Sequence, residues 1–262
     1  MTTHPPLLSA TGVIAACTLR EVMRDRWVWT AALMIGAGWV LALFFGELLL
    51  TGTEGSQAAI LGFFFRLGCV FQMATLVTFA VARELQNRGF DLILALPFPR
   101  AVVFMGRFLG FAMVAVLLAL VCGLALLPLV PAGQAVLWSM ALGCELLLMA
   151  GVSLVLTLTL RQAPLAMTLT AGFYLLARSM GTLLLIARQT SEMNPHWSSI
   201  GAKIVVTCIA GVLPGLDHFT ASEWLVYQTG SFTALLPILE ETGIYLLLLI
   251  ATGLVDLYGK DF

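Results

Sequence analysis

The chain alternates between long apolar runs and short polar interruptions. Six of the runs reach or exceed the roughly 20 residues that a helix needs to cross a bilayer. We predict membrane-spanning helices at residues about 29–50, 58–82, 101–127, 135–160, 164–187 and 236–257. The predicted fold class is an all-α polytopic membrane protein with six transmembrane helices.

Residues 1–28, before the first span, have a different pattern. A tail with two prolines leads into a segment in which charged positions recur at helical spacing, with apolar side chains opposite. We predict a cytoplasmic tail and an amphipathic helix on the membrane surface, followed by the six-span domain over residues 29–262. The charged face of the interfacial helix comprises Arg20, Glu21, Arg24 and Asp25.

The longest charged interruption in the first half of the chain separates the second and third spans. Residues 84–96 place apolar and charged positions on different faces of a short helix, and Pro97 and Pro99 end it. A short helix with a polar face between two spans offers a surface to a cytoplasmic partner.

The segment before the last span, residues about 195–230, is irregular. Its apolar run Ile204–Leu213 is about half as long as a span requires, and Pro214 and Gly215 follow it as a break. We predict short outer helices here, and both a re-entrant and an interfacial placement of the run are compatible with the sequence.

Composition supports the membrane class and excludes others. The chain is 60% hydrophobic and 10% charged, and its mean hydropathy is +1.01, well above the range of soluble domains. A net charge of -1 argues against a nucleic-acid partner. The five cysteines form no close-spaced pair, so neither a disulfide framework nor a metal site is predicted.

Basic residues indicate the orientation of the spans. They gather in the N-terminal segment and in the predicted loops on the same side of the membrane, whereas Arg188 and Lys203 fall on the opposite side. Because cytoplasmic loops are enriched in Lys and Arg, both termini are predicted to be cytoplasmic.

Few residues within the spans depart from apolar packing. Arg66, Glu145 and Arg178 are predicted at similar depths in the outer half of the membrane, where charges usually pair or face water. Glu145 paired with an arginine beside a translocation route and an ion pair that locks the bundle are both compatible with this pattern. Gly106 and Gly110 form a G-x-x-x-G pattern, which permits close helix contact.

Catalytic and nucleotide-binding motifs are missing from the sequence. It contains no H-x-x-x-H, G-x-S-x-G or G-x-x-x-x-G-K pattern, so we predict a non-enzymatic chain that binds no cofactor of its own. Energy for transport would come from a partner or from an ion gradient. The gradient alternative is a secondary transporter or channel that uses Arg66, Glu145 and Arg178.

The amino-acid sequence around the predicted short helix resembles that of the permease subunits of ABC-2 type exporters. Residues 83–85 read R-E-L, residues 88–97 read R-G-F-D-L-I-L-A-L-P, and residues 106–110 read G-R-F-L-G. Residues 213–219, L-P-G-L-D-H-F, with residues 225–227, L-V-Y, are similar to the subgroup associated with multicopper-enzyme maturation, which includes the nitrous-oxide-reductase maturation permease.

This resemblance implies a bacterial inner-membrane permease that pairs with a second permease subunit, identical or different. Each subunit would bind a separate cytoplasmic ATPase, which holds ATP and Mg²⁺, through the 84–96 coupling helix and the interfacial helix. A periplasmic partner is compatible with this role, and the transported substrate is not implied. The residues implied in ATPase coupling are Glu84, Arg88, Gly89, Phe90, Asp91, Leu92 and Leu96.

Overall fold

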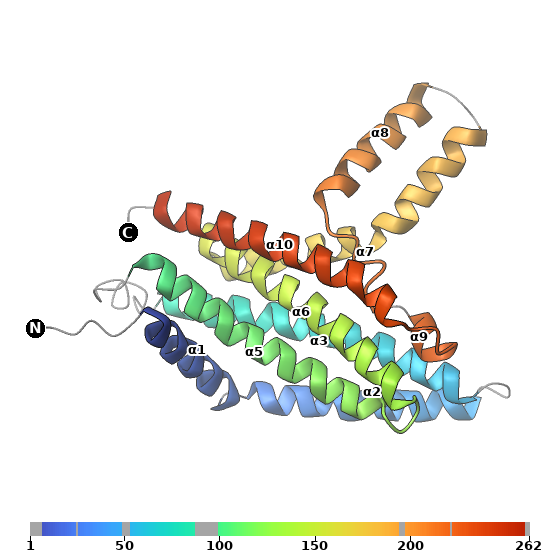
Figure 1. Cartoon of the computed structure of the whole chain (residues 1–262), viewed down its shortest axis with the longest axis horizontal. Helices are drawn as coiled ribbons and strands as arrows, with labels where there is room; N and C mark the ends of the chain where they lie inside the picture. The colour runs from blue at the N-terminus through green and yellow to red at the C-terminus, as the bar shows by residue number, and fades with distance from the viewer. Residues whose placement is uncertain are drawn as a thin grey trace, which may run out of the picture.

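A computed structural model describes residues 7–24, 26–48, 53–86, 99–193, 197–220 and 222–259. These residues form helices joined by short turns, and none of them lies in a strand. The helices gather into an elongated bundle with the start of α1 and the end of α10 near the same end (Figure 1). The bounds are α1 (Leu7–Arg24), α2 (Trp27–Leu48), α3 (Thr53–Gln86), α5 (Arg100–Leu126), α6 (Ala132–Leu160), α7 (Ala163–Met193), α8 (Trp197–Val212), α9 (Ser222–Val226) and α10 (Phe232–Gly259).

Six of these helices, α2, α3, α5, α6, α7 and α10, are long and apolar enough to cross a membrane. The predicted all-α, multi-pass membrane fold is therefore confirmed. The helix α8 contains a shorter apolar stretch, Lys203–Val212. Its end at Val212, two residues before Pro214, agrees with the predicted break.

Several predicted boundaries differ from the structure, and α3, for example, begins at Thr53 and not near residue 58. The second span was expected to end near residue 82, but α3 continues to Gln86, so Glu84 lies in the last turn of α3 and not in a separate helix. The helix α7 continues about six residues beyond its expected end, to Met193. Polar residues at both helix ends are compatible with a helix that extends out of the hydrocarbon region. Residues 87–98, which hold most of the predicted coupling helix, lie outside the described residues.

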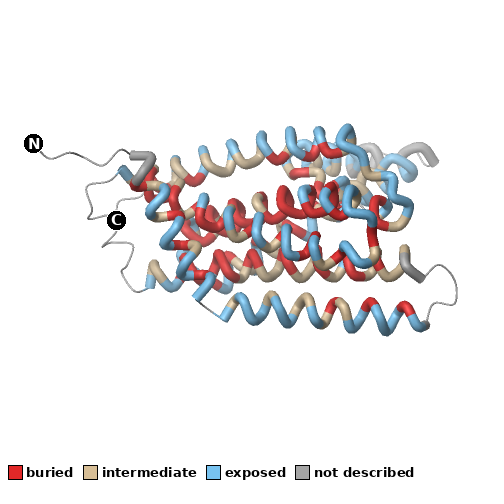
Figure 2. The backbone as a smooth tube through the Cα atoms, turned by 60° about the horizontal axis from the view of Figure 1, so that its bottom comes forward, coloured by how far each residue is buried: buried red, intermediate tan, exposed pale blue. Residues whose placement is uncertain are grey.

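The helix α6 forms the centre of the bundle. In its most apolar stretch 89% of the residues are buried, against 11% for α2 and 17% for α10. Figure 2 shows the same contrast between a buried centre and an exposed periphery. The hydroxyl groups of Ser153 and Thr157 donate to the carbonyls of Met149 and Ser153, four residues earlier. These bonds satisfy polar groups within α6, so the helix can be buried on all sides.

The predicted interfacial helix, α1, packs closely on α5 through the G-x-x-x-G pattern. A Cβ atom built on Gly106 would lie 2.7 Å from the Cβ of Ile14, and one on Gly110 would lie 2.5 Å from the Cβ of Thr18. No side chain fits at these two positions without moving α1. The two glycines therefore allow α1 and the first part of α5 to approach each other closely.

The predicted outer segment contains two helices in different environments. The second part of α7 and α8 form a hairpin that projects from the bundle (Figure 1). After α8 the chain turns back, and Leu216 and Phe219 are completely buried against the bundle. The short helix α9 follows, with Trp224 and Leu225 buried. This return of the chain brings the turn at residues 213–220 to the charged residues of the spans.

Candidate functional site

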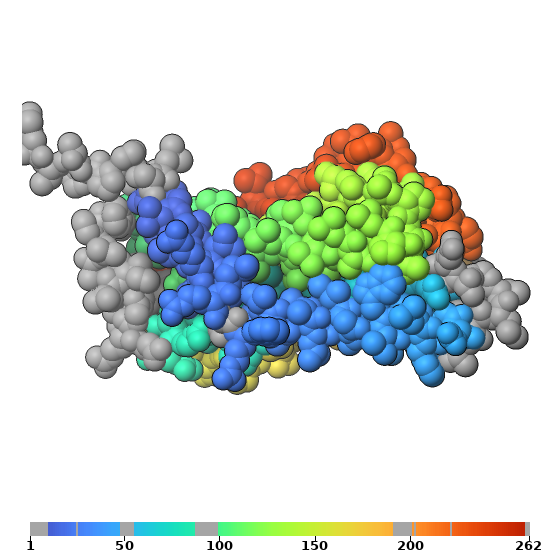
Figure 3. Space-filling model, turned by 90° about the horizontal axis from the view of Figure 1, so that it is seen from below, coloured from blue at the N-terminus to red at the C-terminus, as the bar shows by residue number. Residues whose placement is uncertain are grey.

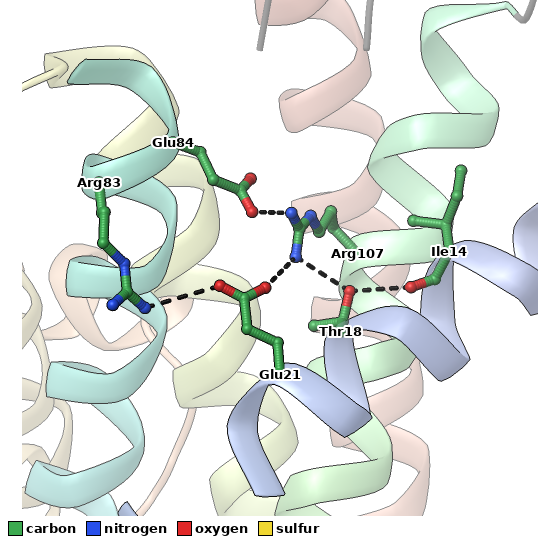
Figure 4. A network of polar contacts seen from close by, with 6 residues as sticks. All are labelled: Ile14, Thr18, Glu21, Arg83, Glu84 and Arg107. Carbon is green, nitrogen blue, oxygen red and sulfur yellow. Dashed lines mark hydrogen bonds and ion pairs between the residues drawn. The ribbon is translucent and has the colours of Figure 1, made fainter. Parts of the chain in front are cut away.

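Charged side chains of three helices meet at the end of the bundle where α3 ends and α5 begins. We call this group the inner polar network; it comprises Thr18 and Glu21 of α1, Arg83 and Glu84 of α3, and Arg107 of α5 (Figure 4). Arg107 lies at its centre and forms an ion pair with Glu84. Its Nη1 atom is 3.4 Å from Oε2 of Glu21 and donates to the hydroxyl of Thr18 at 3.1 Å.

Two further contacts complete the network. The Nη2 atom of Arg83 is 3.6 Å from Oε1 of Glu21. The hydroxyl of Thr18 donates to the carbonyl of Ile14 at 3.0 Å, so it accepts from Arg107 while donating within its own helix. Glu21 thus connects the α3 and α5 arginines, and Arg107 connects α1 to α3.

The two central side chains are mostly buried, and the outer two are not. Arg107 and Glu84 have side-chain exposures of 13% and 14%, whereas Glu21 and Arg83 are 41% and 54% exposed. The Oε2 atom of Glu84 is buried without a hydrogen-bond partner. Because removing one member of a buried pair leaves an uncompensated charge, the Arg107–Glu84 contact is the strongest link between α3 and α5 here.

Helix packing explains why these residues meet. Ile14, Thr18 and Glu21 follow one another along one face of α1. Gly106 and Gly110 bring that face against α5, and Arg107 follows Gly106 directly. Arg107 therefore projects into the polar side of α1, where Thr18 and Glu21 accept its hydrogen bonds.

The inner polar network lies at both flanks of the predicted coupling segment. Glu84 precedes residues 87–98 by one turn of helix, and Arg107 follows them by two turns. The two flanks are thus joined directly, and α1 is joined to both. Of the predicted coupling residues, the structure describes Glu84, whose carboxylate binds Arg107 within the chain.

The other predicted coupling residues, and one residue of the interfacial face, stay predictions. They lie outside the described residues: Asp25, Arg88, Gly89, Phe90, Asp91, Leu92 and Leu96. Sequence reasoning did not identify Arg107 as part of a site. A signal was present, because Arg107 is a charge within an apolar helix and lies between the two glycines of a helix-contact pattern.

The second polar group lies in the half of the bundle that is predicted to be the outer one. Arg66 of α3, Glu145 of α6 and Arg178 of α7 come together around the turn at residues 213–220. Glu145 is completely buried, and its Oε2 atom accepts a hydrogen bond from the hydroxyl of Thr220 at 2.8 Å. Arg66 donates to the carbonyl of Thr220 at 3.1 Å.

Arg178 binds the same turn from the other side. It donates to the carbonyl of Phe219 at 2.9 Å and also to the carbonyl of Leu216. The second oxygen of Glu145, Oε1, is buried without an ordinary hydrogen bond.

The backbone of Thr220 adopts an unusual conformation that these contacts stabilise. Its φ of 45° lies in the left-handed region, which a β-branched residue rarely occupies. The hydroxyl of Thr220 binds Glu145 and its carbonyl binds Arg66, so both polar groups of the strained residue are satisfied. We did not identify Thr220 from the sequence, because a lone threonine in a polar segment carries no distinguishing signal.

The predicted clustering of the three intramembrane charges is therefore seen, but the expected direct ion pair is not. Glu145 forms no ion pair with Arg66 or Arg178, and each charge binds the returning turn. The reason is geometric, since the carbonyls of the turn lie between the three helices. Of the two interpretations left open above, this arrangement favours a role in holding the bundle together.

The outer end of α10 contributes a further contact to the returning turn. Glu241 accepts a hydrogen bond from the backbone N–H of Gly215. Among the residues that the structure describes, no three His, Cys, Asp or Glu side chains come together as metal ligands. No protein-family model matches the chain, and no curated protein is significantly similar to it.

Proposed function

We propose that this chain is the membrane permease subunit of an ABC-2 type exporter, which is driven by a separate cytoplasmic ATPase. The observation that carries the proposal is the inner polar network. It joins α1, α3 and α5 on both flanks of the 84–96 segment. A partner that displaces this segment would move three helices together.

The proposed coupling follows from the stiffness of these connections. Glu84, which precedes residues 87–98 in the sequence, forms an ion pair with Arg107, which follows them. The close packing at Gly106 and Gly110 makes α1 move with the first part of α5. Closure of the ATPase would therefore tilt the inner ends of α3 and α5 relative to α6, which is buried in the centre.

Exposed apolar faces support a second permease subunit. The helices α2, α7 and α10 have most of their apolar stretches exposed, with 11%, 22% and 17% of the residues buried. Such faces pack against lipid or against another subunit. The proposal includes a bacterial inner-membrane location with both termini in the cytoplasm.

The gradient-driven alternative receives less support from the outer charges. Arg66, Glu145 and Arg178 are engaged with the turn at residues 213–220. A coupling site for an ion needs these groups to change partners during transport. In this structure the three side chains instead hold the turn at residues 213–220 of the same chain in place.

The test is an affinity purification of the tagged chain from native membranes in mild detergent, with mass spectrometry of what is bound. We expect a stoichiometric soluble ATPase with a phosphate-binding loop. Arg88→Glu should abolish its binding, because a charge reversal at an interface leaves repulsion and unpaired groups.

The matched control is Arg161→Glu, which makes the same charge change at the turn between α6 and α7. It lies on the same predicted side of the membrane, outside the coupling segment. A folded oligomer that carries no ATPase, or an ATPase retained equally by both variants, would refute the proposal.

A further inference from the structure

A basic cavity lies beside the inner polar network, between α1 and the end of α3. Its volume is about 480 Å³, and it is lined by Cys17, Arg20, Glu21, Arg24 and Arg83. The four α1 residues occupy positions i, i+3, i+4 and i+7, so they form one stripe on α1 that faces Arg83. Among the residues that the structure describes, this lining contains three arginines and one carboxylate.

Two arginines of this cavity, Arg20 and Arg24, have charge to offer to a ligand. The carboxylate of Glu21 is directed toward Arg83 and Arg107. Arg20 and Arg24 are exposed, and no carboxylate of the described residues pairs with either. Two guanidinium groups one helical turn apart, with a third across the cavity, suit an anion with several oxygen atoms, such as a phosphate.

A second cavity lies nearer the middle of the bundle, also between α1 and α3. It has a volume of about 310 Å³ and an almost entirely apolar lining from α1, α2, α3 and α5. The residues that define it include Val22, Trp27, Ala31, Ile35, Leu76 and Leu118. Val22 follows Glu21 directly, so α1 contributes to both cavities.

The spacing of the two cavities matches the layers of a membrane. Leu76 lies seven residues before Arg83 on the same face of α3, which corresponds to about 10 Å along the helix. The polar layer of a bilayer is about 5–8 Å thick on each side of the hydrocarbon core. A molecule with its phosphate at the arginines would therefore place its next atoms in the apolar cavity.

From these two cavities we infer a binding site for one anionic phospholipid of the leaflet that faces α1. Its phosphate would bind Arg20, Arg24 and Arg83, and an acyl chain would lie along Trp27 and Leu76. Both α1 and the end of α3 reach the surface at the same end of the molecule (Figure 3), so a lipid can enter from the side. The inference concerns α1 and the bundle, and it does not depend on an ATPase partner.

The test uses the position of Trp27 in the apolar cavity. The full chain is placed in phosphatidylcholine nanodiscs that contain a small, increasing fraction of phosphatidylglycerol with brominated acyl chains, which quench nearby tryptophans. We expect saturable quenching that is lost in Trp27→Phe. Brominated phosphatidylcholine at the same fraction should quench weakly and without saturation.

Two variants separate the polar and apolar parts of the site. Arg20→Gln with Arg24→Gln should weaken phosphatidylglycerol binding roughly thirtyfold, the factor expected when two arginines lose their attraction to an anionic surface. Ala31→Phe should fill the apolar cavity and weaken binding with all the arginines present. Arg161→Gln, a matched control that removes one charge elsewhere on the same predicted side, should bind normally.

Three results would overturn the inference. One is equal binding of phosphatidylglycerol by the double arginine variant and the unaltered chain, each eluting as a folded protein in size-exclusion chromatography. Another is equal, saturable quenching by phosphatidylcholine. The third is full displacement of the lipid by millimolar inorganic phosphate, which would show that the arginines form a site for a soluble anion.

Discussion

Arg107→Met tests whether the inner polar network joins α1, α3 and α5. Methionine keeps much of the length of the arginine side chain but removes its charge and its donors. Glu84, which is 14% exposed, would then be mostly buried with no cation partner among the described residues. Glu21 would keep Arg83, at 3.6 Å, as its partner.

The size of the effect follows from the burial of each contact. Breaking a buried ion pair on one side costs about 3–5 kcal/mol, and both Arg107 and Glu84 are below 15% exposure. The contact with Glu21, which is 41% exposed, adds about 0–1 kcal/mol because solvent screens it. We therefore expect Arg107→Met to lower the free energy of unfolding by about 3–5 kcal/mol.

The assay is unfolding by sodium dodecyl sulfate in mixed micelles, followed by circular dichroism. A double-mutant cycle with Glu84→Gln isolates the pair, and we expect a coupling energy of about 2–3 kcal/mol. The matched control is Arg20→Met, because Arg20 is exposed and has no carboxylate partner among the described residues. Its effect should stay within about 0.5 kcal/mol.

Additivity would refute this reasoning. If Arg107→Met and Glu84→Gln change stability independently, with a coupling energy below about 0.5 kcal/mol, the two side chains do not form a stabilising pair. The inner polar network would then be no mechanical link, and the proposed coupling route from residues 87–98 to the spans would lose its basis.

Three further predictions concern the packing, the outer charges and the orientation. Gly110→Ala should lower the free energy of the same unfolding transition by about 1–3 kcal/mol, because its Cβ would lie 2.5 Å from a side-chain carbon of α1. The control Gly172→Ala, whose Cβ would meet nothing within 4 Å, should stabilise the protein by up to about 1 kcal/mol. Equal effects of the two substitutions would contradict the close contact between α1 and α5. Glu145→Gln should destabilise by about 1–2 kcal/mol, because a charged acceptor becomes a neutral one, and unchanged stability would contradict its role in holding the turn. A membrane-impermeant maleimide should label Cys17 in inverted vesicles alone and His218→Cys in right-side-out vesicles alone; the reverse pattern would contradict the orientation.

The six spans could be predicted because length and apolarity are properties of each segment alone. The predicted third span, residues 101–127, differs by one residue at each end from α5, Arg100–Leu126. The predicted end near residue 82 fell short by a full turn. Arg83 and Glu84 are compatible with a helix that continues beyond the apolar layer of the membrane. The change from apolar to polar residues therefore indicates where this layer ends and not where the helix ends.

The polar contacts could not be predicted in the same way, because they depend on packing between distant segments. Arg107 binds Glu21, which is 86 positions away in the chain, and Arg178 binds Phe219, which is 41 positions away. Their similar predicted depth in the membrane indicated that Arg66, Glu145 and Arg178 lie close together, and this prediction was correct. Depth alone did not indicate that backbone carbonyls of a returning turn would occupy the space between them.

The burial of α6 has a consequence for how the sequence can change over time. Its residues contact neighbours on every side, so a substitution that changes volume there disturbs several helices together. Residues of α2 and α10 that face lipid meet one requirement, which is apolarity. Sequence differences among relatives should therefore concentrate on α2 and α10. The pattern of small and large side chains along α6 should be kept, so the sequence of α6 should identify distant relatives most reliably.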